Sequence, residues 1–124
     1  MNMKIKIISI WIVKVIIAVI LLQTLFFKFT AHPDSVLLFS ELGIEPWGRI
    51  LLGIIELFVA VGILIPSTAF FASMGAVILM VGAIFSHLFF IGVVFNDDGG
   101  GLFILAVVTF ILSLIVAYFE IKKK

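Results

Sequence analysis

The sequence contains no cysteine and few charged residues, and each shortage excludes a class of protein. Without cysteine the chain has no disulfide, no thiolate metal ligand and no dithiol relay for electrons. Charged residues make up 12% and hydrophobic residues 65% of the 124 positions, whereas ordinary soluble domains have about 25% and about 45–50%. A soluble chain of this size leaves roughly a third of its unfolded surface exposed to water. The composition therefore predicts an integral membrane protein.

The sequence also lacks the motifs that are typical of soluble enzymes and nucleic-acid-binding proteins. We find no Walker A loop, no GxGxxG after a strand, no serine or cysteine nucleophile signature and no basic, aromatic surface for nucleic acid. Two distant histidines and one membrane carboxylate do not form a metal ligand set at helical spacing. The net charge of +1 gives no reason to expect a polyanionic partner. We therefore predict no nucleic-acid partner and nominate no catalytic or metal-binding residue.

Four apolar runs are present, and turn residues separate them. A spanning helix needs about 20 apolar residues, so the chain has room for four spans, short connections and no further domain. The first run is longer than the apolar core of a signal peptide, about 7–15 residues, so we expect a span there and no cleavage. The expected fold is all-α: one integral membrane four-helix bundle over residues 1–124, up-down-up-down, with spans at about 7–29, 47–65, 69–95 and 102–119.

The longest connection, residues 30–46, mixes turn residues with an apolar stretch at residues 36–39. This pattern predicts a short amphipathic turn or helix at the membrane interface. His32 precedes Pro33 there, and we expect it to be solvated or to cap a helix.

The charges predict an orientation. An even number of spans places both termini on one side, which carries Lys4, Lys6, Lys122, Lys123 and Lys124. The opposite side carries Asp34, Glu41, Glu45, Asp97 and Asp98. By the positive-inside rule, both termini face the cytoplasm.

The ionisable residues that we place within the spans are the most informative ones, since each costs at least a few kcal/mol at the bilayer centre. They are Lys14, Lys28, Arg49, Glu56 and His87. In the second span Arg49, Gly53, Glu56 and Ala60 recur at intervals of four, three and four, so they share one helical face. Small residues allow close helix packing, so this face should point inward. Glu56 is either a functional group or a paired packing contact.

His87 lies in the outer third of the third span, at the depth of Arg49 and Lys28. We therefore predict that Lys28, Arg49, Glu56 and His87 converge on one ligand-binding site, where His87 or Glu56 exchanges a proton. The alternative for His87 is a core histidine with satisfied hydrogen bonds. Lys14 is expected to extend its ammonium back to the cytoplasmic boundary. Gln23, on the opposite face of the first helix, either marks the packed side or bonds a neighbour.

Two stretches carry a family resemblance, FFKFTAHPDSVLLFSELGIEPWGRILLGIIELFVAVGILIP and GAIFSHLFFIGVVFNDDGGGLFILA. The specific features are Lys28 at the end of the first span, LGIEPWGR leading to Gly53 and Glu56, GAIFSHL with His87, and the DGG turn. Together they resemble the DoxX family of small bacterial membrane proteins, from Leu25 to about Ala117; Lys14 is not part of that pattern. The resemblance implies a four-helix bundle in the bacterial plasma (inner) membrane and a loose association with quinone or sulfur redox chemistry. The absent cysteines separate the chain from four-helix thiol-oxidising membrane proteins.

Three functions remain open. The first is a redox-associated accessory subunit whose polar pocket binds a quinone-like or small anionic molecule; quinone is then the cofactor, and electrons come from a partner. The second is a non-catalytic scaffold that docks a membrane protein through glycine and alanine stripes. The third is a small transporter or channel subunit. Four spans in one chain are few for a transporter, so the pore would form between the copies of a homo-oligomer.

Overall fold

Every regular element is helical in the part of the chain that the structure, a computed structural model, describes, residues 2–95 and 98–123. The elements are α1 (Met3–Phe29), α2 (Pro33–Glu41), α3 (Trp47–Ile63), α4 (Ala69–Ser86), the π-helical segment η1 (His87–Ile91) and α5 (Gly101–Lys123). The expected all-α class is confirmed.

Within the described ranges, three helical stretches are long and apolar enough to cross a membrane: Met3–Phe29, Ala69–Ile91 and Gly101–Lys122. Most of their large apolar side chains point outward, as lipid contact requires. α3 has 17 residues, about 25 Å at 1.5 Å per residue, which is shorter than a hydrocarbon core of about 30 Å. The protein is thus a membrane protein with apolar helices in a lipid bilayer.

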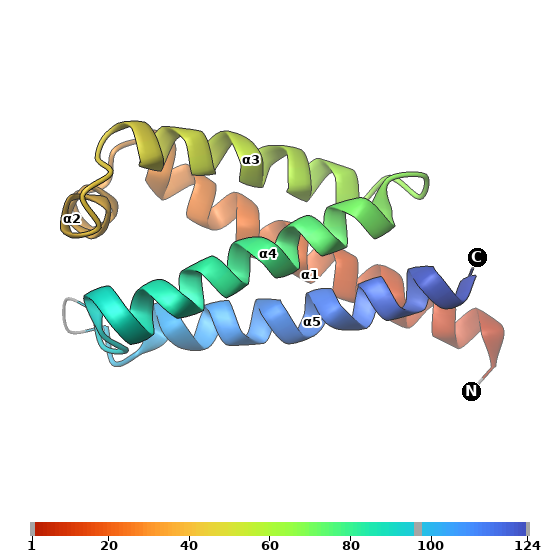
Figure 1. Ribbon diagram of the computed structural model, residues 1–124. Helices are drawn as coiled ribbons and strands as arrows, with labels where there is room; N and C mark the ends of the chain where they lie inside the picture. The colour runs from red at the N-terminus through yellow and green to blue at the C-terminus, as the bar shows by residue number, and fades with distance from the viewer. Residues whose placement is uncertain (1, 96–97, 124) are drawn as a thin grey trace.

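The long helices pack as two pairs, α1 with α3 and α4 with α5, and α4 also packs on α3 (Figure 1). Both termini and the turn between α3 and α4 lie at one end of the molecule (Figure 1). At the other end lie α2, η1 and the start of α5 (Figure 1). We refer to these as the terminal end and the loop end.

Small residues allow the helices to approach closely. A Cβ atom built on Gly62 of α3 would lie only 3.1 Å from the Cβ of Ala72 on α4. The surrounding core is apolar and includes Ile17, Leu21, Ile63, Ala76 and Val116. In a bilayer, where lipid tails are as apolar as leucine, such close packing holds helices together.

The connection after α1 forms the expected short helix, α2. His32 is its N-cap: the ring Nδ1 accepts a hydrogen bond of 3.2 Å from the backbone N–H of Asp34. Pro33 follows at the first helical position, where its missing N–H costs nothing. The expected capping role of His32 is therefore confirmed.

The third apolar run leaves α-helical geometry earlier than its composition suggests. The α-helix ends at Ser86, the π-helical segment continues to Ile91, and Gly92 follows with φ +84°. π-Helical turns are rare and frequently occur at functional sites. This segment carries His87.

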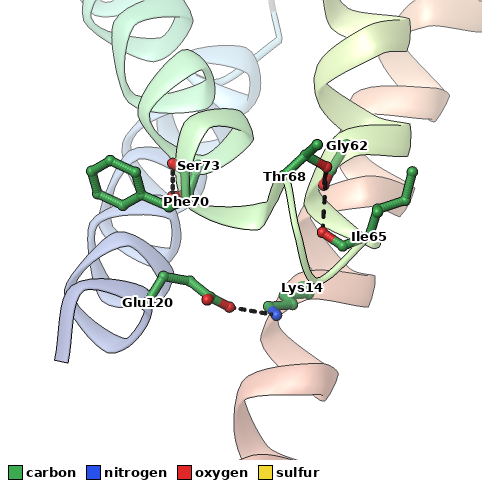
Figure 2. Close-up of polar contacts among 7 residues, drawn as sticks. All are labelled: Lys14, Gly62, Ile65, Thr68, Phe70, Ser73 and Glu120. Carbon is green, nitrogen blue, oxygen red and sulfur yellow. Dashed lines mark hydrogen bonds and ion pairs between the residues drawn. The ribbon is translucent and has the colours of Figure 1, made fainter. Parts of the chain in front are cut away.

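The ammonium of Lys14 does not reach water, so the expectation that it extends out of the membrane interior is wrong. Its side chain is buried, and Nζ lies 2.8 Å from Oε1 of Glu120 on α5 (Figure 2). The ammonium therefore reaches a carboxylate on a neighbouring helix instead of water, which satisfies the charge inside the protein. Gln23 is exposed, so the packed side of α1 is the Lys14 side and not the Gln23 side.

The turn between α3 and α4 is held by its own hydrogen bonds. The Thr68 hydroxyl lies 2.7 Å from the carbonyl oxygen of Gly62 and 3.3 Å from that of Ile65 (Figure 2). Thr68 thereby satisfies the carbonyl end of α3 instead of capping the start of α4. Near this turn, the buried Ser73 hydroxyl donates to the carbonyl oxygen of Phe70 at 2.7 Å (Figure 2).

Candidate functional site

A cavity of about 730 Å³ lies toward the loop end, and its wall includes residues of all the helices. Most of the wall is apolar. The polar and charged lining residues are Thr24, Lys28, His32, Asp34, Ser35, Glu56, Ser86, His87, Asp98 and Thr109. The volume falls in the range of about 300–1,000 Å³ that is usual for small-molecule sites.

A buried ion pair forms one side of the cavity. Lys28 Nζ, at the end of α1, lies 3.0 Å from Oε1 and 3.3 Å from Oε2 of Glu56 on α3. The Thr24 hydroxyl lies one turn earlier on α1, 2.9 Å from Glu56 Oε2. The inward face predicted from Arg49, Gly53, Glu56 and Ala60 is confirmed, since all four residues are buried.

His87 forms another side. Its Nδ1 lies 2.9 Å from the carbonyl oxygen of Gly92. A carbonyl oxygen only accepts, so Nδ1 carries the proton, and Nε2 of the neutral ring is left as an acceptor. The edge of the ring packs on Phe103 at 5.8 Å between centroids, which holds the imidazole in place.

Asp98 forms the rim near His87 and caps α5. Its carboxylate accepts hydrogen bonds from the backbone N–H groups of Phe95, Gly100 and Leu102, at 3.1, 2.8 and 3.2 Å. Burial alone would raise the pKa of this carboxyl, but the three hydrogen bonds, with a smaller effect of nearby His87, hold the pKa below its usual value of 3.8. Asp98 is therefore ionised and rigidly placed; Asp97, expected beside it, lies outside the described residues.

Arg49 lies next to the cavity and outside its lining. Its Nε donates to both carboxylate oxygens of Glu45, at 2.8 and 3.0 Å. One of its terminal nitrogens donates to the backbone carbonyl of Lys28. Of the four residues predicted to converge, Lys28, Glu56 and His87 line one cavity, and Arg49 holds the backbone of Lys28.

The sequence did not lead us to predict Thr24 and Thr109 as lining residues, and Asp98 was interpreted only as part of a turn. Thr24 stands four residues before Lys28, so the helical repeat places both on one face. Asp98 precedes three glycines and an apolar run, which is a helix-start pattern. Thr109 shares a helical face with Ser113 and Glu120, and this spacing was the available signal; it was missed because only charged residues and histidines were considered as site candidates within the spans.

The charges of the cavity favour a neutral ligand. Its described lining has one lysine and three carboxylates, Asp34, Glu56 and Asp98. Both cations of this region already contact carboxylates, Lys28 with Glu56 and Arg49 with Glu45. Among the described residues no group of three His, Cys, Asp or Glu side chains can hold a metal ion.

Comparison with known proteins gives one result that concerns the whole site. No curated protein and no solved structure matches the chain. The sequence profile of the DoxX-like family matches residues 12–116, which include Lys28, Arg49, Glu56, His87 and Asp98. Because this match covers most of the 124 residues, the chain belongs to the DoxX-like family.

Proposed function

We propose that residues 1–124 form a single four-span bundle in the bacterial plasma membrane, with both termini in the cytoplasm. α3, the second helix of the expected four, then crosses the membrane together with the three longer helical stretches. Its large exposed side chains are all apolar: Trp47, Ile50, Leu51, Ile54, Ile55, Leu57, Phe58 and Val61. A short span is accommodated by local thinning of the bilayer, and Trp47 suits the interface. The orientation is supported by the lysines at the terminal end.

Within this bundle, we propose that the cavity binds a neutral ring compound of the quinone class, and that the protein is a redox-associated accessory subunit. The observation that carries this proposal is an apolar cavity of about 730 Å³ with Lys28, Glu56 and His87 in its wall. The apolar wall suits the ring and tail of a quinone. The polar groups suit its two oxygens.

Each polar group has a role in this proposal. The ammonium of Lys28 donates to a quinone oxygen and shares its charge with Glu56. The free Nε2 of His87 accepts the hydroxyl proton of a quinol. Arg49 positions Lys28 through the backbone carbonyl. The chain handles protons only, so the two electrons of a quinone couple go to or come from a redox protein partner.

A small anion, the other ligand considered from the sequence, is supported less well. An anion would meet three carboxylates in the described lining, and neither Lys28 nor Arg49 has an uncompensated charge to offer. A neutral molecule avoids this repulsion and still uses the hydrogen-bonding groups.

Thermal unfolding of the purified protein in detergent, with ubiquinone or menaquinone of short tail length, tests the proposal. A ligand at about 100 times its Kd stabilises the folded state by about 2.7 kcal/mol, so the melting temperature should rise. Glu56→Gln should reduce this rise in melting temperature, because a neutral amide cannot neutralise the Lys28 ammonium or keep it in place as the carboxylate does. The control is Glu41→Gln, a change at an exposed carboxylate of α2. Identical melting curves with and without both quinones would contradict quinone binding.

A further inference from the structure

α5 carries three polar side chains on its buried face. Thr109, Ser113 and Glu120 follow at intervals of four and seven residues, which place them on one side of an α-helix. All three are at most 1% exposed. We call these residues the α5 polar face. Since a polar side chain inside a membrane protein is costly, three on one face require an explanation.

Ser113 is the key residue of this face. Its Oγ is buried and has no hydrogen-bond partner among the described residues. A buried hydroxyl without a partner costs about 1–3 kcal/mol. Two other buried hydroxyls are satisfied along their own helices: Thr109 donates to the carbonyl of Leu105 at 2.8 Å, and Ser73 on α4 donates to that of Phe70 at 2.7 Å. Ser113 is thus ready to bind a water molecule or another protic group.

The α5 polar face joins two sites at opposite ends of the molecule. Thr109 lines the cavity at the loop end. Glu120 is paired with Lys14 near the terminal end (Figure 2). At 1.5 Å per residue, Ser113 lies about 6 Å from Thr109 and about 10 Å from Glu120 along the helix axis. The adjacent α4 packs on α5 and carries one more buried hydroxyl, Ser73, on its first turns.

We propose that the α5 polar face is a proton route between the cavity and the Lys14–Glu120 ion pair. A proton from the terminal side binds the Glu120 carboxylate and weakens its bond to Lys14. Water held by Ser113 takes that proton from the neutral acid, which returns to its carboxylate. The proton passes by Thr109 to a basic group of the cavity, His87 Nε2 or the Glu56 carboxylate. Only protons move, so no electron donor or acceptor is needed.

The two ion pairs limit how often a proton enters the route. In the resting state each carboxylate is neutralised by a lysine, Glu120 by Lys14 and Glu56 by Lys28. A proton enters only when one of these contacts loosens, which keeps the conductance low. The route uses only side chains of this chain and water, so it does not depend on quinone binding.

Proton flux into liposomes tests the proposal. Full-length protein is reconstituted, a potassium diffusion potential is set with valinomycin, and internal pH is followed with a trapped dye. We expect flux above that of protein-free liposomes and at least a fivefold loss in Ser113→Ala. The control, Ser9→Ala, removes a half-buried hydroxyl that is bonded to its own helix and should leave the flux unchanged.

Two further variants separate the route from simple packing. Thr109→Val keeps the side-chain shape and should lower the flux, whereas Ser113→Thr keeps the hydroxyl and should retain most of it. If Ser113 only fills space, Ser113→Ala removes a buried hydroxyl that has no partner, and the proton flux stays at the wild-type value. Wild-type flux equal to that of empty liposomes, or equal flux in wild type and Ser113→Ala, would overturn the proposal.

Discussion

Lys14 and Glu120 stand 106 positions apart in the sequence, yet Nζ and Oε1 are 2.8 Å apart, and this contact ties the first helix to the last. Both side chains are almost completely buried. Removing one partner of a buried ion pair leaves the other charge without its counterpart, which costs about 3–5 kcal/mol. We therefore expect Lys14→Met to lower the free energy of unfolding by about that amount, measured by denaturation in bicelles.

The double variant Lys14→Met/Glu120→Gln makes this prediction specific. Replacing both charges removes the penalty of an unmatched ion, so it should be more stable than Lys14→Met alone. Lys6→Met, at an exposed position near the start of α1, is the control and should change stability by less than about 0.5 kcal/mol. Strictly additive losses in the double variant would show that the two charges do not stabilise each other.

The inward face of α3 is the part of the site that sequence spacing predicted best. Arg49, Gly53, Glu56 and Ala60 repeat with the helical period, and such a local pattern is independent of the other helices. A short turn or helix in residues 30–46 and a possible cap at His32 were predictable for the same reason, because proline and its neighbours act locally.

Contacts between helices were less predictable. Lys14 and Glu120 each resemble an ordinary charge near a membrane boundary, and only the relative depth of α1 and α5 reveals the pair. Arg49 does contact the backbone of Lys28, one of the residues with which it was predicted to converge, but its bonds to Glu45, four residues earlier in the chain, were not predicted. The π-helical segment at His87 also depends on packing, since no residue type specifies it.

Gly53 marks a close approach between α3 and α1. A Cβ atom added there would lie 2.6 Å from Cε1 of Phe29, so the ring must move. We expect Gly53→Ala to cost about 1–3 kcal/mol of stability. Gly82→Ala is the matched control, since nothing lies within 4 Å of its added Cβ, and it should gain up to about 1 kcal/mol from helix propensity. Equal effects of the two changes would contradict this packing.

Asp98 should make stability depend on acid pH. Its pKa in the folded state is lower than the usual 3.8, because three backbone N–H groups bond the carboxylate and outweigh its burial. A lowered folded-state pKa contributes stability that is fully present above the usual value and is lost as the pH falls through the folded value. The wild-type melting temperature should therefore fall more steeply below about pH 4 than that of Asp98→Asn. Glu41→Gln, which changes an exposed carboxylate on α2, should keep the wild-type slope; parallel curves for wild type and Asp98→Asn would refute the capping role.

Arg49 should matter more for stability than for ligand binding. A lysine ammonium cannot bond Glu45 and the Lys28 carbonyl with the geometry of a guanidinium. We expect Arg49→Lys to lower the free energy of unfolding by about 1–2 kcal/mol and to weaken quinone binding less than threefold. A larger loss of binding than of stability would mean that Arg49 contacts the ligand directly.

His87 offers two variants that separate its two ring nitrogens. In His87→Asn the side-chain amide takes the place of Nδ1 and can donate to the Gly92 carbonyl, which the ring contacts at 2.9 Å, but nothing replaces Nε2. In His87→Gln the longer side chain reaches the position of Nε2 and loses the bond to Gly92, which costs about 0.5–1.5 kcal/mol. If Nε2 faces the ligand, His87→Asn keeps the unfolding free energy and loses the quinone-induced rise in melting temperature, whereas His87→Gln is less stable and keeps part of that rise. A full quinone response in His87→Asn would mean that the ring supports η1 and takes no part in binding, because only the Nδ1 contact would then have survived.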